Sequence, residues 1–297
     1  MITGFQYHTP RSLEEAFALL RDYGDDAHII AGGTALVILM KQRLVQPTHL
    51  VSLSKIPGLD SIATGDERVH IGAMCTHRMV ETSPILKEVV PLLSETYYHV
   101  ATPRIRNMAT VGGGLAHADP NLDPPPSFIA LGARVVLRNP SGERTLLAEE
   151  FFLDYYETAI QPGEILTEVI VPRVPSNSGT CFIKFLPRTA DDYATVSVAI
   201  LLTLSDQDSS MCQDVRISLG SVGPMPIRAR GAEAILRGRP ITPELMRQAS
   251  EAVEAEVEPL DDFRGSARYK TQMAQVFTRR ALEQALRQAQ DGLQERY

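Results

Sequence analysis

Residues 110–114 read Thr-Val-Gly-Gly-Gly, and residues 31–35 read Ala-Gly-Gly-Thr-Ala. Both glycine clusters follow an apolar or β-branched run, and both carry a hydroxyl side chain beside the glycines. Glycine tolerates positive φ and lets a ligand approach the backbone without meeting a Cβ. Backbone amides in such turns form concavities that bind anions. One Gly-Gly-Thr is more often an ordinary turn, but the two clusters together favour a cradle for pyrophosphate, the middle of a dinucleotide cofactor.

Outward from the first cluster, residues 28–30 predict a short strand and residues 35–42 predict a helix. A strand, a glycine turn and a helix start place free amides where an anion can use them. Further upstream, Ser12 and Glu15 form a capping box, and apolar residues recur at helical spacing until Gly24. The second cluster is followed by a polar run that contains His117, Asp119, Asn121 and Asp123.

The chain has 297 residues, of which 44% are hydrophobic, so it is long enough for two domains with sizeable cores. Residues 172–179 are rich in Pro, Ser, Asn and Gly, and we place the boundary there, with domains at 1–175 and 176–297. Beyond it, residues 182–186, 194–204 and 214–222 predict three strands. Residues 243–256 and 267–286 then predict two helices.

Composition excludes several classes of protein. The net charge of −7 offers no basic surplus for nucleic acid. Three cysteines are too few for a four-thiolate iron–sulfur cluster, and they show no disulfide framework. The N-terminus lacks the pattern of a signal peptide, and no apolar run is long enough to span a membrane, so we expect a soluble cytoplasmic protein. The histidines form no i,i+4 pair, so we expect no metal site.

Four segments, in this order, carry a family resemblance: IAGGTALV at 30–37, GAMCTH at 72–77, IRNMATVGGGLAHADPNLD at 105–123 and KFLPRTADDYATVSVA at 184–199. The chain resembles, essentially end to end, the FAD-binding medium subunit of molybdenum hydroxylases. That family includes the carbon monoxide dehydrogenase medium subunit and the xanthine dehydrogenase flavin domain. The implied fold is α+β. It comprises a two-subdomain FAD-binding domain of the vanillyl-alcohol-oxidase (PCMH) type, then a C-terminal domain with a three-stranded antiparallel sheet and helices.

The resemblance also implies which residues bind FAD. Amides of both clusters and the Thr34 and Thr110 hydroxyls would hold the pyrophosphate, with His117 near the flavin or the pyrophosphate. Asp123 would bind the adenosine ribose, Leu166 would pack on adenine or flavin, and Lys184 would lie near the flavin ring. Many members have asparagine where this chain has Gly114, which removes a side-chain amide. The full implied set is Ile30, Ala31, Gly32, Gly33, Thr34, Ala35, Leu36, His77, Thr110, Val111, Gly112, Gly113, Gly114, His117, Asp119, Asp123, Leu166, Lys184 and Tyr193.

Tyr193 follows Asp191 and Asp192, and the resemblance places it close to the isoalloxazine ring, where it would gate the electron acceptor; an ordinary turn tyrosine is the equal alternative. The implied function is electron transfer. FAD would take electrons from two [2Fe–2S] clusters on a small subunit and pass them to NAD, oxygen or a quinone-type carrier. A large molybdopterin subunit would oxidise the substrate, in a heterotrimer or a dimer of heterotrimers. Two alternatives stay open: a self-contained FAD-dependent oxidoreductase of the same fold, and a flavin-free docking subunit.

Overall fold

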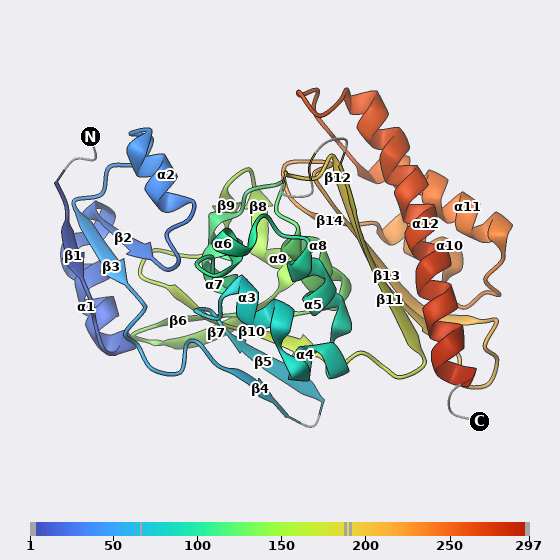
Figure 1. The fold of residues 1–297 in the computed structure, drawn as a ribbon, viewed down its shortest axis with the longest axis horizontal. Coiled ribbons are helices and arrows are strands. Elements are labelled where there is room, and N and C mark those ends of the chain that lie inside the picture. The colour runs from blue at the N-terminus through green and yellow to red at the C-terminus, as the bar shows by residue number, and fades with distance from the viewer. Residues whose placement is uncertain (1–3, 66, 187–188, 190–191, 295–297) are drawn as a thin grey trace.

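The computed structural model describes residues 4–65, 67–186, 189 and 192–294. The helices and strands gather into two sheet-based units followed by a third with a long terminal helix (Figure 1). No helix among the described residues is long and apolar enough to cross a membrane.

The N-terminal unit is a three-stranded parallel sheet in the order β1-β3-β2, which lies to one side of the molecule in Figure 1. Ser12 caps the helix that follows β1, because its side chain accepts a hydrogen bond from the Glu15 amide, and Gly24 ends that helix. Ser12 is therefore confirmed as the N-cap, but the predicted capping box is incomplete, because the Glu15 side chain accepts from the Arg11 amide at 2.7 Å rather than from the Ser12 amide. The elements of this unit are β1 (Gln6–His8), α1 (Leu13–Tyr23), η1 (Gly24–Asp26), β2 (Ala27–Ile30), α2 (Leu36–Lys41) and β3 (His49–Ser52).

The second unit is a five-stranded antiparallel sheet in the order β4-β5-β10-β6-β7, with short helices covering one face. Its strands are β4 (Ile62–Thr64), β5 (Arg68–Gly72), β6 (Arg134–Asn139), β7 (Gly142–Leu147) and β10 (Ile165–Pro172), and a separate hairpin is formed by β8 (Phe152–Asp154) and β9 (Glu157–Thr158). Its helices are α3 (His77–Thr82), α4 (Pro84–Val89), α5 (Pro91–Tyr98), α6 (Pro103–Arg106), α7 (Val111–His117), α8 (Pro124–Ala130) and α9 (Ala148–Phe151).

The C-terminal unit contains a four-stranded antiparallel sheet in the order β11-β12-β13-β14. The expectation of three strands was wrong by one, because a two-residue strand near Pro226 adds to the edge of the sheet. So short a strand carries no alternating pattern in the sequence. The elements are β11 (Ser178–Phe185), β12 (Val196–Leu204), β13 (Cys212–Gly220), β14 (Ile227–Arg228), α10 (Arg230–Leu236), α11 (Pro243–Ala252), η2 (Val253–Glu256) and α12 (Ala267–Gln294).

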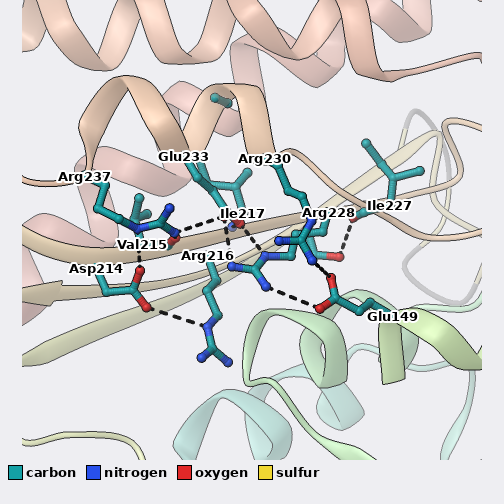
Figure 2. A network of polar contacts seen from close by, with 12 residues as sticks. Glu149, Asp214, Val215, Arg216, Ile217, Ile227, Arg228, Arg230, Glu233 and Arg237 are labelled. Carbon is teal, nitrogen blue, oxygen red and sulfur yellow. Dashed lines mark hydrogen bonds and ion pairs between the residues drawn. The ribbon is translucent and has the colours of Figure 1, made fainter. Parts of the chain in front are cut away.

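Charged side chains join the C-terminal unit to the second unit (Figure 2). Glu149 of α9 accepts from the Arg228 guanidinium at 3.4 Å and from Arg230 at 2.8 Å. Arg228 also pairs with Glu233, whose side chain is 1% exposed, at 2.8 Å. Desolvated charges of this kind are stable only as fully paired networks. The network therefore ties the C-terminal unit to α9.

Candidate functional site

The first glycine cluster is a half-buried loop between β2 and α2, as the sequence predicts. Among the described residues, none accepts a hydrogen bond from the Gly32, Gly33 or Thr34 amide. Gly32 cannot carry a side chain, because a Cβ there would lie 1.9 Å from the Met108 carbonyl oxygen. The loop thus presents consecutive free donors to an anion.

The second glycine cluster was expected to be a loop, but in the structure it forms the first turn of α7. Thr110 is its N-cap, and its side chain accepts from the Gly113 amide at 3.1 Å. The Val111 amide donates to Cys75 O at 2.9 Å and the Gly112 amide to Ala73 O at 2.8 Å. These amides already have protein partners, so they differ from those of the first cluster.

Close packing explains why the second cluster is glycine. A Cβ on Gly112 would lie 2.5 Å from the Ala73 Cβ, so only glycine lets α7 rest on the chain that leaves β5. A Cβ on Gly113 would lie 3.3 Å from the Ala31 Cβ. The two glycine clusters, far apart in sequence, therefore meet in the folded chain.

His77 lies beneath α7 and is 4% exposed. Its Nε2 is 3.2 Å from Thr110 O, and its backbone amide donates to Ala109 O at 2.9 Å. Burial lowers the pKa of His77 to about 4, so the ring is neutral near pH 7 and Nε2–H is the donor to Thr110. Its position makes His77 a support of the second cluster.

Asp123 and Lys184 form a buried ion pair between the two domains. Lys184 Nζ lies 2.8 Å from Asp123 Oδ2 and donates to His99 O at 2.9 Å, and the two side chains are 3% and 5% exposed. Burial raises the pKa of Asp123 to about 6, and the Lys184 ammonium opposes that rise. The other oxygen, Asp123 Oδ1, is buried and has no partner among the described residues. The resemblance implied separate places for the two residues, Asp123 at the ribose and Lys184 at the flavin ring, and the structure brings their side chains into direct contact.

A second polar cluster surrounds Asp119, which is 7% exposed and accepts from the Asn121 amide at 2.9 Å. Burial, then the Asp119 carboxylate, raise the pKa of both Tyr156 and Tyr193 above the ordinary value. The Tyr156 ring lies 5.4 Å from the ring of His117, whose pKa burial lowers. Tyr156 was missed by sequence reasoning, because neither spacing nor a motif marks it.

Tyr193 is 47% exposed, and the Arg264 guanidinium lies 6.0 Å from its ring centroid. Its neighbour Asp191 lies outside the described residues.

The other residues of the implied set lie in different surroundings. Leu166 is 5% exposed and belongs to the core of the second unit. Val111 is fully buried, so it offers its backbone alone. Ile30, Ala31, Ala35 and Leu36 are half-buried around the first loop. A Cβ added to Gly114 would lie 3.5 Å from His77 Nε2.

Known protein families match both parts of the chain. Residues 3–174 match the FAD binding domain in molybdopterin dehydrogenase, and residues 182–285 match the CO dehydrogenase flavoprotein C-terminal domain. The carbon monoxide dehydrogenase medium chain of Hydrogenophaga pseudoflava is 39% identical over 281 residues, covering 95% of this chain and 96% of that protein. The 6-hydroxypseudooxynicotine dehydrogenase complex subunit alpha of Paenarthrobacter nicotinovorans is 37% identical, covering 96% and 95% of the two chains.

Solved structures agree with these matches. A chain of the Hydrogenophaga pseudoflava carbon monoxide dehydrogenase superposes with a TM-score of 0.93 at 39% identity, covering 97% of this chain and 99% of that one. A chain of quinoline 2-oxidoreductase from Pseudomonas putida 86 superposes with a TM-score of 0.90 at 33% identity and the same coverage. The resemblance seen in the sequence and its α+β fold are thereby confirmed, and the chain belongs to the FAD-binding medium-chain family of the molybdopterin dehydrogenases.

Proposed function

We propose that this chain holds FAD where the two glycine clusters meet and relays electrons through it within a larger molybdenum-containing complex. The observation that carries the proposal is the row of free amides at Gly32, Gly33 and Thr34, pressed against the segment that precedes α7. Free donors at a strand-to-helix turn suit a pyrophosphate. The Thr34 hydroxyl adds a further donor to the same group.

The remaining residues fit FAD in a different way from the one that the sequence suggested. The second cluster would contribute mainly close packing, since its first amides have protein acceptors and the Thr110 side chain caps α7 by accepting from the Gly113 amide. Asp123 Oδ1 is a free, buried acceptor for a cofactor hydroxyl or N–H. Lys184 holds that carboxylate in place from the C-terminal domain. We infer that the two act as one unit at one part of the cofactor.

Bound FAD supplies reversible uptake of one or two electrons. The chain itself has only Cys75, Cys181 and Cys212, all buried, so it has too few thiolates for a Cys₄ iron–sulfur cluster. The proposed electron source is therefore a small subunit with two [2Fe–2S] clusters, fed by a large molybdopterin subunit. The proposed assembly is a heterotrimer or its dimer, in the cytoplasm, with a domain boundary near residue 175.

Tyr193 is proposed as the gate for the electron acceptor, which is NAD, oxygen or a quinone-type carrier. Its ring is partly exposed, and its hydroxyl stays protonated, because burial and Asp119 raise its pKa. It can move to admit a flat ring without a change in charge. Variant Tyr193→Ala should alter the rate of flavin reoxidation more than the rate of flavin reduction.

The test is purification of the complex through a tag on this chain, followed by flavin and subunit analysis. We expect FAD bound in equal amount to the chain, together with an iron–sulfur and a molybdopterin subunit. Anaerobic reduction of the clusters should bleach the flavin, and the acceptors can then be offered one at a time. Turnover of a small-molecule substrate by the chain alone would favour the self-contained oxidoreductase. A colourless complex that takes up no FAD would favour the docking subunit.

A further inference from the structure

Arg106 stands four residues before Thr110, in α6, and its side chain is 7% exposed. Its Nε donates to Glu81 Oε2 at 2.8 Å. Its Nη1 donates to Val100 O at 2.8 Å and to Ala101 O at 3.0 Å. One guanidinium thus joins three pieces of chain: α3, the turn after α5, and α6 itself. The guanidinium reaches these acceptors with two nitrogens that are held rigidly in one plane.

Stability alone does not account for this pair. A buried ion pair contributes little net stability, because desolvation of both charges offsets their attraction. The turn that it holds is strained, since Ala101 has a φ of +41°, which a residue with a Cβ rarely adopts. Such strain persists only where the surroundings enforce it. Arg106 bonds the carbonyls of the two peptides that flank the Cα of Ala101.

Both ends of the held segment lead into the site. Before it, His99 O accepts from Lys184 Nζ, which pairs with Asp123. After it, α6 leads to Met108, whose carbonyl oxygen lies against Gly32 of the first loop. Moving the turn would therefore shift Lys184 at one side and the contact between the two glycine clusters at the other.

We propose that Arg106 and Glu81 are positioning residues for FAD: they fix the segment from His99 to Met108, and so set the distance between the two halves of the cradle. The placement of FAD in that cradle rests on the function proposed above. Neither side chain touches the cofactor in this arrangement. Their effect passes through the His99 and Met108 carbonyls.

Variant Arg106→Lys tests the proposal in the purified complex, depleted of FAD and titrated back with it. Lysine keeps a positive charge beside Glu81, but its single nitrogen cannot stand both where Nε bonds Glu81 and where Nη1 bonds the two carbonyls. We expect FAD affinity to fall about tenfold, as the loss of one charged hydrogen bond predicts, and the visible bands of the bound flavin to shift. The matched control is Arg144→Lys, because Arg144 likewise bonds a buried glutamate, Glu164, and a backbone carbonyl, that of Ala159, elsewhere in the same domain.

Thermal melting of both FAD-free variants separates stability from positioning. Arg144→Lys should lower the melting temperature and leave FAD affinity unchanged. The proposal is overturned if Arg106→Lys binds FAD like the wild type, or if both variants lose affinity alike. Should Arg106→Lys fail to assemble, Glu81→Gln gives the same measurement, with loss of affinity expected and wild-type affinity contradicting the proposal. A wild-type complex that binds no FAD would instead refute the proposed function.

Discussion

The two glycine clusters read alike in sequence and do opposite things in the structure. The amides of the first have no acceptor among the described residues, whereas the first amides of the second bond to Ala73, Cys75 and Thr110. One cluster therefore offers donors to a ligand, and the other lets a helix approach its neighbours. Glycine suits both roles, because the missing Cβ permits close approach by a ligand or by another part of the protein.

Substitution in the first cluster should have the largest effect on the cofactor. The Cβ of Gly32→Ala would sit 1.9 Å from the Met108 carbonyl oxygen, so the loop must move away from the segment that precedes α7. We expect FAD retention in the purified complex to be lost, with only a modest fall in the melting temperature, because the loop is half-buried. Gly65→Ala is the control, since a Cβ there meets nothing closer than 3.8 Å. Full flavin occupancy in Gly32→Ala would show that the first loop is not the cradle.

His77, which supports the second cluster, should make the free energy of unfolding depend on pH. The folded pKa of His77 lies near 4, below its ordinary value of 6.5, so the folded chain binds fewer protons than the unfolded chain between these values. Stability from His77 is therefore present above pH 6.5 and is lost as pH falls toward 4, by about 3 kcal/mol. In His77→Gln, which keeps a donor for Thr110 O, this slope should disappear. Denaturant unfolding across that pH range measures it, and an unchanged slope would contradict the assignment.

Crowding in the second cluster should act on stability first. Gly112→Ala places a Cβ 2.5 Å from that of Ala73, inside the core. Overpacking of this kind costs about 2 kcal/mol. Denaturant unfolding of the FAD-free chain should measure that loss of stability. Under conditions where the variant is fully folded, its FAD affinity should fall less than that of Gly32→Ala. If Gly112→Ala were as stable as the wild type but free of FAD, the contrast between the clusters would collapse.

The two threonines provide the smallest and sharpest comparison. Thr110→Ala removes the N-cap of α7 and should cost about 1 kcal/mol of unfolding free energy. Thr34→Ala removes a hydroxyl from the first loop and should weaken FAD binding severalfold with no change in stability. Flavin titration and thermal melting of both variants measure whether one loses stability and the other loses FAD affinity. Equal behaviour of the two would mean that the clusters share one role.

Local patterns in the sequence were informative where a few neighbouring residues decide the structure. Ser12 and Gly24 mark both ends of α1, since caps act through bonds to the adjacent turn. The second cluster misled because glycine is a poor helix former, so three in a row suggest a turn. The bonds to Ala73 O and Cys75 O, made by residues distant in sequence, override that preference.

The sequence by itself determined the family, the α+β class and the glycine segments, because motif order and short-range spacing are written along the chain. Only the tertiary structure decided that the first cluster keeps its amides free and the second does not. It also decided that Asp123 meets Lys184 across the two domains. The physical reason is that a hydrogen-bond donor is free or satisfied according to what folds against it, and those partners lie dozens of residues away.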